Sequence, residues 1–388
     1  MIDNNARCHA FRRLLDCGKN KGYSLKILLS YPTEYEQGEG VHYERVLRRL
    51  GHEVVALNVA TRPQDGAAGR MVCGYPPDVT VQELLGDHGD ADLFLYVEPL
   101  GLIPRGLETA PFPSACIISD VHRNLGCRKT LAKCFDWVFL YQRNYVQHFT
   151  DRRHDTVRWL PYACDTEIFK DLQLERDLDI AFAGKVLGVP RRRYRIISKL
   201  SSEYKMNPMQ WYSQSEIAHL YSRAKIVVNV PVGDDLNFRV FEALSCGALL
   251  ITERANNGQE ELFKENEHYV AFSTERELWA KIGYYMANGR EREEIARSGN
   301  SEVMKRHSLE LRLAALLREV SSGAKYCAPI RHMEGFEVAL IYARIYERAG
   351  QIGSLLTLSA REKKSLSRRL RLLAIGARAF CRRAVLGW

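Results

Sequence analysis

The sequence has little of what marks a membrane-spanning, secreted or metal-binding protein. No apolar run approaches the ~20 residues that a transmembrane helix needs. Residues 1–24 are polar and contain no hydrophobic centre, so we expect a leader that is not a secretory signal. The ten cysteines form no CxxC pair and have no histidine cluster beside them. Because a disulfide framework or a zinc site would need such spacings, we expect reduced thiols, no metal site and a cytoplasmic location.

Acidic residues are scarce at the carboxyl end of the chain. Residues 361–388 contain nine basic residues and a single acid, Glu362, which gives this stretch a net charge of +8. The whole chain carries +9, so the remainder is nearly neutral. A length of 388 residues predicts about two domains, and 46% hydrophobic with 27% charged residues is typical of a globular protein. We therefore expect a globular body that carries a basic tail.

The chain is organised around residues 225–270, where two apolar runs flank a short helical pattern. The runs IVVNV at 226–230 and ALLIT at 248–252 are short and rich in branched residues, which predicts buried strands. Between them, FRVFEALS at 238–245 has helical spacing and stops before Gly247. Strand, loop, helix and strand in this order form the unit of a doubly wound sheet, whose ligands bind beyond the carboxyl ends of the strands.

Arg239 and Glu242 are three residues apart and share one face of this helix. Spacing alone leaves two interpretations open, an exposed Arg–Glu pair or a pair of ligand-binding side chains. The whole string LNFRVFEALSCG at 236–247 resembles the donor-site helix of a glycosyltransferase group named after spore-maturation proteins. That group is related to the retaining family-4 glycosyltransferases. The resemblance is clear from about 159 to 317 and weaker before that.

The resemblance implies an α/β fold with two Rossmann-like, doubly wound domains that face a cleft, the GT-B architecture. It also implies a nucleotide diphosphate-sugar as the donor. In family 4 two glutamates border the donor, and the second usually holds the ribose hydroxyls. Glu242 matches the second glutamate, while Asp234 stands at the place of the first and has a shorter side chain. By the same resemblance, Asn237 and Arg239 shape the donor site.

A second group of candidates follows the expected strand at 178–183. Gly184 begins a turn, and cations lie at the start of the next helix, where backbone N–H groups and the helix dipole favour anions. The resemblance implies that a lysine and an arginine near this turn neutralise the leaving diphosphate. That role falls to Lys185 and to Arg191 or Arg192, although a solvated basic helix start is the alternative for at least one arginine of 191–193.

A third candidate group is the loop before the expected helix at 259–263. Asn257 and Gly258 precede this helix, and its free N–H groups are placed to contact the sugar or its phosphate.

The first half of the chain has a βαβ rhythm, with strands expected at 25–30, 53–57, 91–97, 115–118 and 137–140. The first loop lacks the GxGxxG spacing, which leaves only Gly38 and Gly40 as candidates, with a simple turn requirement as the alternative. The DxD at 90–92 precedes a strand, so we expect a turn there and no obligatory metal.

Asp120 and His122 come directly after the expected strand at 115–118. This is where the fold places reacting groups, and histidine suits general acid–base work near neutral pH. The resemblance favours a role on the acceptor side for both residues. The alternative is an aspartate that caps a helix start and a histidine on the surface.

The patterns divide the chain into a leader at 1–24, an acceptor domain at 25–160, a nucleotide-sugar domain at 161–325 and a helical tail at 326–388. In the tail, apolar residues recur at helical spacing with the arginines mostly on the other side: Leu366, Leu370, Leu373, Ala377, Phe380 and Ala384. A basic amphipathic helix of this kind suits an anionic membrane surface. The alternatives are a helix packed on the protein body and a nucleic-acid-binding segment, although stacking aromatics are limited to Phe380 and Trp388.

We therefore expect a hexosyl-type glycosyltransferase that works in surface polysaccharide or glycoconjugate synthesis. It would move a sugar from a nucleotide diphosphate-sugar to a glycan, a lipid or another acceptor, with retention and without an obligatory metal or cofactor. In a retaining reaction the leaving phosphate can take the acceptor's proton, and Asp120 and His122 would then position the acceptor. A peripheral place at the inner face of the membrane, through residues 361–388, completes this prediction. The alternatives are a sugar-nucleotide epimerase of the same fold and a nucleic-acid-binding protein that uses the basic tail.

Overall fold

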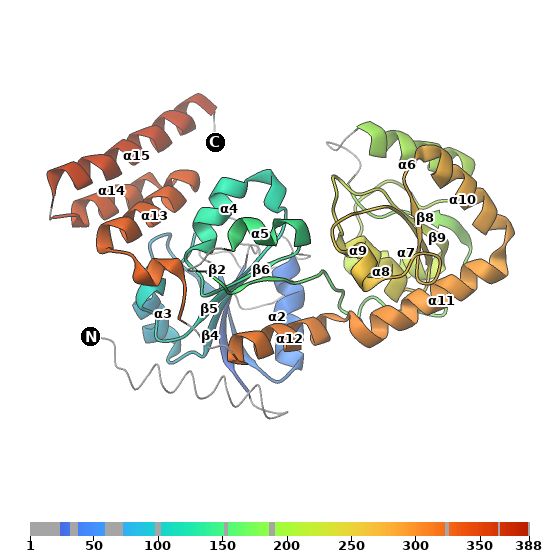
Figure 1. The fold of residues 1–388 in the computed structure, drawn as a ribbon, viewed down its shortest axis with the longest axis horizontal. Helices are drawn as coiled ribbons and strands as arrows, with labels where there is room; N and C mark the ends of the chain where they lie inside the picture. Colours follow the sequence, from blue (N-terminus) through green and yellow to red (C-terminus); the bar gives the residue numbers. More distant parts are fainter. Residues whose placement is uncertain are drawn as a thin grey trace. The chain divides into compact units, whose positions relative to one another are not determined.

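A computed structural model of the protein shows an α/β chain with two compact units, each built on a parallel sheet (Figure 1). The structure describes residues 24–31, 38–58, 73–97, 102–150, 154–185, 191–322, 326–363 and 365–386. The first unit comprises Met1–Leu140, Tyr145–Trp159 and Ala315–Trp388, and the second comprises Tyr141–Asn144 and Leu160–Ala314. The leader proposed for residues 1–24 lies outside the described residues, except for Ser24. The α/β class with two parallel sheets is confirmed.

The sheet of the first unit has seven parallel strands in the order β3-β2-β1-β4-β5-β6-β7. Because β1 pairs with both β2 and β4, the strand order reverses beside it, as in a doubly wound fold. The central strands β4, β5 and β6 are buried along their whole length, which explains why they are continuous apolar runs. The strands are β1 (Lys26–Ser30), β2 (Glu53–Asn58), β3 (Cys73–Gly74), β4 (Leu93–Val97), β5 (Ser114–Ile118), β6 (Trp137–Leu140) and β7 (Val157–Trp159).

Short helices connect these strands. Thr80 caps α3 by accepting a hydrogen bond from the Glu83 backbone, and the Glu83 side chain bonds back to Thr80 N. The helices and turns are α2 (Glu39–Arg49), α3 (Val81–His88), η2 (Leu107–Thr109), η3 (Val121–Arg123), α4 (Leu125–Ala132), η4 (Arg143–Tyr145) and α5 (Val146–Phe149).

The second unit has four parallel strands in the order β11-β10-β9-β8. Its core lies between the sheet and the helices α6, α10 and α11, with Ile180, Val228, Ile251, Ile196 and Leu278 fully or almost fully buried. The strands are β8 (Leu178–Ala181), β9 (Ala224–Asn229), β10 (Leu249–Glu253) and β11 (Val270–Phe272). The helices are α6 (Arg191–Glu203), α7 (Gln214–Arg223), α8 (Phe238–Ser245), α9 (Gln259–Leu262), α10 (Glu275–Ala287) and α11 (Gly289–Arg306).

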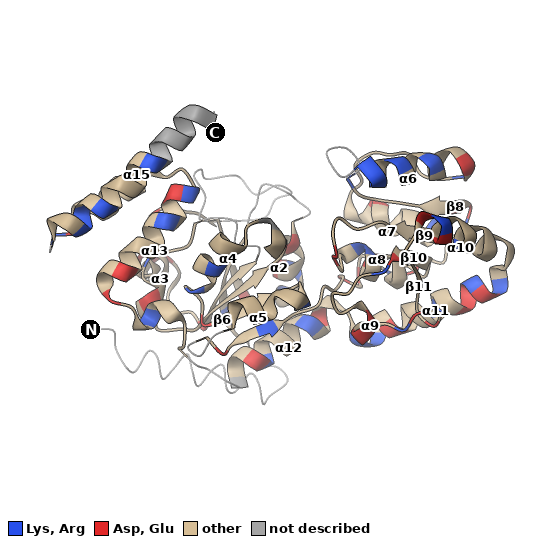
Figure 2. Cartoon of the chain, turned by 45° about the horizontal axis from the view of Figure 1, so that its top comes forward, with Lys and Arg blue, Asp and Glu red and all other residues tan. Residues whose placement is uncertain are grey.

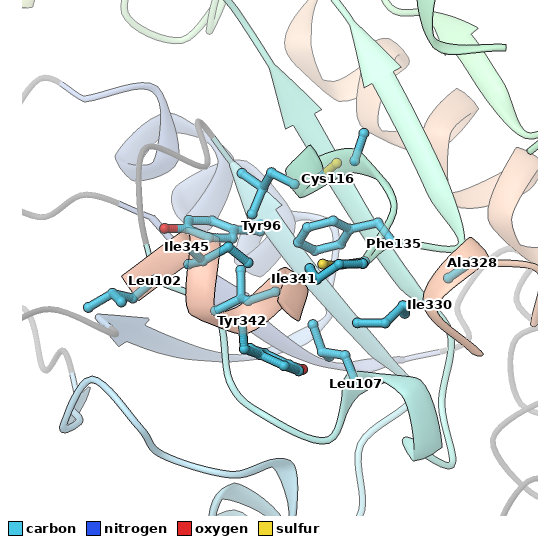
Figure 3. Close-up of a cluster of buried hydrophobic side chains, with 14 of the residues drawn as sticks. Tyr96, Leu102, Leu107, Cys116, Phe135, Ala328, Ile330, Ile341, Tyr342 and Ile345 are labelled. Carbon is cyan, nitrogen blue, oxygen red and sulfur yellow. The ribbon is translucent and has the colours of Figure 1, made fainter. Parts of the chain in front are cut away.

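The carboxyl-terminal helices pack on the first unit. Ile330, Ile341 and Tyr342 join the same buried cluster as Phe135 and Cys116 beside the seven-stranded sheet (Figure 3). The helices α13, α14 and α15 pack against one another. This part of the chain contains α12 (Leu309–Ser322), η5 (Pro329–His332), α13 (Gly335–Arg348), α14 (Ile352–Arg361) and α15 (Leu366–Leu386).

The described residues can be searched for membrane-spanning helices and for metal-binding groups. Within those ranges, no helix combines the length and the apolar character needed to cross a membrane. In the same part of the chain, His, Cys, Asp and Glu side chains do not gather in groups of three or more that could hold a metal. Asp92 of the DxD accepts a hydrogen bond from Lys26 N at 2.8 Å, so its carboxylate fixes the turn to the start of β1.

Candidate functional site

A loop at residues 230–237 follows the carboxyl end of β9 and leads into helix α8, and this is where a doubly wound fold binds its ligands. Val240, Phe241 and Leu244 are buried, which fixes the rotation of the helix about its axis. Phe238 at its first position packs against Tyr162, with ring centroids 4.5 Å apart. The same rotation places Arg239 and Glu242 on the partly exposed side of the helix.

Arg239 connects the ends of two strands of the second sheet. Its Nε and Nη2 donate to the carbonyl oxygen of Ala183 at 2.9 and 2.7 Å, and its Nη1 donates to Asn229 Oδ1 at 2.6 Å. The guanidinium also lies 4.4 Å from the centre of the Phe182 ring. It forms no ion pair with Glu242 or with another described carboxylate, so the interpretation as an exposed Arg–Glu pair is wrong.

Gly184 has no side chain, and the Arg239 guanidinium occupies the space where a side chain would be. A Cβ atom at this position would lie 2.1 Å from Arg239 Nη2, closer than any real contact. The glycine expected in a phosphate-binding turn therefore also has a packing function, because any larger residue would displace the guanidinium from the strand ends.

Arg193 is a member of this site that the sequence analysis did not single out. Its side chain is buried, Nη1 donates to the Lys185 carbonyl oxygen at 3.2 Å, and Nε has no hydrogen-bond partner among the described residues. Burial, and next the positive charge of Arg239, lower the pKa of Arg193 to about 10, with partial compensation by Asp235 and Glu253. Two neighbouring guanidinium groups without a paired carboxylate create a strong preference for a bound anion.

The three cations expected at the diphosphate differ in their surroundings. Lys185 and Arg191 are exposed, and their side chains form no ion pair with the described residues. Arg192 instead pairs with Glu253 at 2.8 Å and with Glu275 at 3.5 Å. Arg192 is thus held by the protein's own carboxylates, whereas Lys185 and Arg191 have no ion-pair partner among the described residues.

Glu242 is a partly buried carboxylate without a partner in the described chain. Burial raises the pKa of Glu242 to about 7, and the nearby charge of Arg239 compensates only in part. Burial raises the thiol pKa values of Cys164 and Cys246, and the negative charge of Glu242 raises them further. A carboxyl group in this position titrates near neutral pH and can accept hydrogen bonds from a ligand.

Asp234 and Asn256 join the loops that follow β9 and β10. Asp234 is exposed, and its Oδ1 accepts a hydrogen bond from Asn256 N at 2.6 Å. Asn257 is buried and its Oδ1 accepts from Asn144 N at 3.2 Å, while Gly258 has a φ of 88° immediately before α9. These contacts bring the third candidate group next to the loop that leads into α8.

Asn237 takes part in the polar network at the end of β9. Its Nδ2 donates to Asn229 Oδ1 at 3.3 Å, the same oxygen that Arg239 uses. Its own Oδ1 is buried and has no partner among the described atoms. An acceptor without a donor in this network is available to a ligand hydroxyl or amide.

The acceptor-side candidates lie on the first unit. Asp120 follows β5 with a φ of 44° and a ψ of 38°, a left-handed conformation that is uncommon for residues other than glycine. Its side chain forms no cap hydrogen bond at η3, so the capping part of the alternative is wrong. His122 is exposed, as the same alternative expected. Packing alone explains why position 40 is a glycine, because a Cβ there would lie 2.1 Å from Tyr31 Cγ.

Sequence and structure comparisons agree on a glycosyltransferase-like fold. Residues 167–318, which contain α8 and Arg193, match a family model described as "Glycosyl transferase-like". No curated protein matches the chain in sequence. Sucrose-phosphate synthase from Thermosynechococcus elongatus is similar in structure, with a TM-score of 0.57 and 12% identity over 77% of this chain and 100% of that chain.

Two further solved structures are similar to the same extent. HepE from Anabaena, in complex with UDP and glucose, has a TM-score of 0.56 and 13% identity over 77% of this chain and 99% of that chain. A glycosyltransferase from Rickettsia africae has a TM-score of 0.57 and 12% identity over 78% of this chain and 100% of that chain. The protein thus has a GT-B-like fold, and its chain ends in a group of helices.

Proposed function

We propose that the protein is a glycosyltransferase that binds a nucleotide diphosphate-sugar at the carboxyl edge of its second sheet. The observation that carries this proposal is the neighbouring pair of the buried Arg193 and the partly buried Arg239, neither of which forms an ion pair with a carboxylate among the described residues. They lie in the stretch that matches the glycosyl transferase-like family. A nucleoside diphosphate is an anion whose charge and size suit such a pair.

The proposed chemistry places positive charge where negative charge develops. The acceptor hydroxyl attacks the anomeric carbon, the bond to the diphosphate breaks, and its electron pair leaves with the phosphate oxygen. Arg193 and Arg239, together with the exposed Lys185 and Arg191, stabilise that departing charge. In the retaining reaction that we propose, the acceptor's proton passes to the leaving phosphate, and no obligatory metal is needed because these side chains supply the charge.

Glu242 has the properties expected of the residue that holds the ribose. Its ionised carboxylate would accept hydrogen bonds from the ribose hydroxyls, and no described residue competes for it. Asp234 contacts the transferred sugar or fixes the loop of Asn257 and Gly258 around it, in keeping with its hydrogen bond to Asn256 N. Asp120 and His122 would position the acceptor, a glycan or a lipid in the synthesis of surface polysaccharide or glycoconjugates.

The donor that we propose to test first is a UDP-hexose. HepE, which shares the fold, has been solved with UDP and glucose and with UDP-glucose. The most direct experiment is a thermal-shift titration of the full-length protein with UDP, UDP-glucose and the corresponding guanosine compounds. A ligand at a hundred times its Kd stabilises the folded state by about 2.7 kcal/mol, so binding should raise Tm clearly.

The decisive variant is Arg193→Met, which replaces a buried cation by an apolar side chain of similar length. We expect an unchanged or higher Tm without ligand, because an unpaired buried charge is removed, and a lost response to UDP. Arg290→Met, which removes an exposed arginine of α11, is the matched control and should respond like the unaltered protein. An Arg193→Met protein that still binds UDP normally would contradict the proposal.

Product analysis distinguishes the transferase from the epimerase of the same fold. A transferase releases the nucleoside diphosphate, whereas an epimerase converts the sugar nucleotide to an isomer and releases none.

We also propose that the protein works at the inner face of a membrane as a peripheral protein, in contact with anionic lipid through its carboxyl-terminal helices.

A further inference from the structure

Helix α15 has two apolar faces, and only one of them is covered. Leu372 and Ile375 are buried, with exposed fractions of 0% and 5%, in the cluster that includes Leu355 and Leu358 of α14. On the other side, Leu366, Leu370 and Leu373 are exposed by 72%, 55% and 36%. The apolar stripe that the sequence indicates is therefore the outer face of the helix and not the packed one.

The three exposed leucines form a continuous line, which we call the leucine ridge. Residues 366, 370 and 373 are spaced by four and three, so they stack along one side of the helix, and the exposed Ala377 continues the line. From Leu366 to Ala377 the line extends over roughly 16 Å at the usual helical rise. Phe380 and Ala384, which the sequence places on the same stripe, have side chains outside the described residues.

Cations flank the leucine ridge. Arg369 lies on one side of it and Arg371 and Arg378 on the other, all three exposed, and Figure 2 shows the basic positions spaced along α15. Arg378 forms a long ion pair with Glu347, at 3.9 Å. Arg368 differs from them, because its guanidinium lies 5.0 Å from the centre of the Phe336 ring on the side of the helix bundle. The sequence of α15 contains no acidic residue at all.

We propose that this outer face of α15 binds an anionic membrane surface. Single exposed leucines are common on soluble proteins, but three in a line between arginines have the pattern of a helix that lies in the membrane interface. The leucines would enter the boundary of the acyl chains, and the arginines would meet the phosphate groups of the lipids. A nucleic acid would neutralise the arginines and leave the leucines in water, because stacking requires aromatic side chains.

The rest of the tail presents this face in a fixed orientation. Packing of α15 on α13 and α14 holds the helix, and Arg331 attaches the start of this bundle to Asp136 of the first unit. The helix therefore does not have to fold on the membrane, and the association does not lose free energy in ordering it. The surface is independent of the transfer reaction, so each can be tested without the other.

The experiment is a flotation assay of the full-length protein with lipid vesicles. We expect binding to vesicles with about one-third phosphatidylglycerol and little binding to pure phosphatidylcholine, because the arginines need anionic headgroups. Raising NaCl from about 0.1 M to about 1 M should weaken binding. UDP binding, measured by thermal shift on the same samples, reports on the proposed donor site separately.

The decisive variant replaces the leucine ridge by Leu366→Ser, Leu370→Ser and Leu373→Ser together. We expect at least about tenfold weaker binding to the anionic vesicles and an unchanged Tm, because these side chains are exposed. The matched control replaces three exposed leucines elsewhere, Leu172, Leu174 and Leu311, by serine and should bind like the unaltered protein. Arg369→Gln with Arg371→Gln should weaken the binding to anionic vesicles while leaving Tm unchanged.

Three results would overturn the proposal. Full vesicle binding by the ridge variant would show that the leucines do not enter the membrane. Salt-sensitive binding to a DNA or RNA oligonucleotide, together with no binding to vesicles, would assign the basic face to nucleic acid. A dimer in solution that becomes a monomer in the ridge variant would show that a second copy covers this face.

Discussion

Arg331 and Asp136 form a buried, two-pronged ion pair that connects parts of the chain almost two hundred residues apart. Nε and Nη2 of Arg331 lie 2.8 Å from Oδ1 and Oδ2 of Asp136, and the two side chains are 5% and 0% exposed. Asp136 also accepts hydrogen bonds from Ser114 N and Ala328 N, and Arg331 donates to the carbonyl oxygen of Phe112. The pair thus joins β5, the start of β6 and the tail in one satisfied network.

Removing the arginine of this pair should destabilise the first unit strongly. Arg331→Ala leaves Asp136 buried without its counter-charge, for which a loss of about 3–5 kcal/mol in the free energy of unfolding is typical. Urea unfolding followed by circular dichroism measures it. Arg290→Ala, which breaks an exposed pair with Glu294 on α11, is the control and should cost less than about 1 kcal/mol. Equal losses in the two variants would mean that the buried network does not hold the tail.

Donor binding should depend on pH through Glu242. Since the pKa of Glu242 is raised to about 7, a ribose-binding carboxylate is mostly protonated at pH 6 and mostly ionised at pH 8. We expect the affinity for UDP-glucose to rise by about tenfold between these values and then level off. Calorimetric titration with UDP-glucose is suitable because its diphosphate keeps its charge over this range. Glu242→Gln should bind UDP-glucose weakly at both pH values. An equally steep change of affinity with pH in that variant would show that Glu242 is not the origin of the pH dependence.

Without ligand, the same shift should make ionisation of Glu242 unfavourable for folding. The pKa is higher in the folded protein than the ordinary 4.5, so the folded state holds the proton more tightly, and the stability from this group decreases as pH rises from 4.5 to about 7. Glu242→Gln should therefore be more stable than the unaltered protein at pH 8, by roughly 1–3 kcal/mol, and about equally stable at pH 4. Chemical denaturation at the two pH values measures the difference. No gain at pH 8 would contradict the assigned burial.

Gly184→Ala should weaken donor binding by displacing Arg239. The added Cβ would collide with the guanidinium, so Arg239 must leave Ala183 and Asn229. We expect about tenfold lower affinity for UDP, the effect of losing one charge-assisted contact. Gly86→Ala in α3, where a Cβ meets no atom within 4 Å, is the matched control and should raise stability by about 0.5–1 kcal/mol. Normal UDP binding by Gly184→Ala would show that the position of Arg239 is not required.

His307 should make the second unit sensitive to acid. It packs against Phe241 and Phe263, with ring centroids 6.1 and 4.9 Å away, and burial lowers its pKa to about 4. Because the unfolded chain takes up a proton near pH 6.5 and the folded protein only near 4, the stability from this group is lost as pH falls through that window. His307→Phe should shift the acid-unfolding midpoint to lower pH, measured by tryptophan fluorescence. The exposed His219→Phe should leave the midpoint unchanged.

Local patterns in the sequence determined the elements around the candidate site. The expected helix at 238–245 coincides with α8, and the apolar runs at 226–230 and 248–252 lie within one or two residues of β9 and β10. Arg193 could also have been found. It shares a helical face with the buried Ile196, Ile197 and Leu200, so its spacing marks it as the inward-pointing arginine of the three.

What the sequence by itself determined is the alternation of strands and helices and the place of the site at the strand ends, because these depend on short-range periodicity. Tertiary structure alone decided that Arg239 bonds to Ala183 and Asn229 and not to Glu242. It also decided which apolar face of α15 is covered and that Arg331 meets Asp136. These contacts join residues that are far apart in the sequence and that meet only when the chain is packed. For the same reason, no local pattern predicts which of two equally apolar helix faces becomes buried.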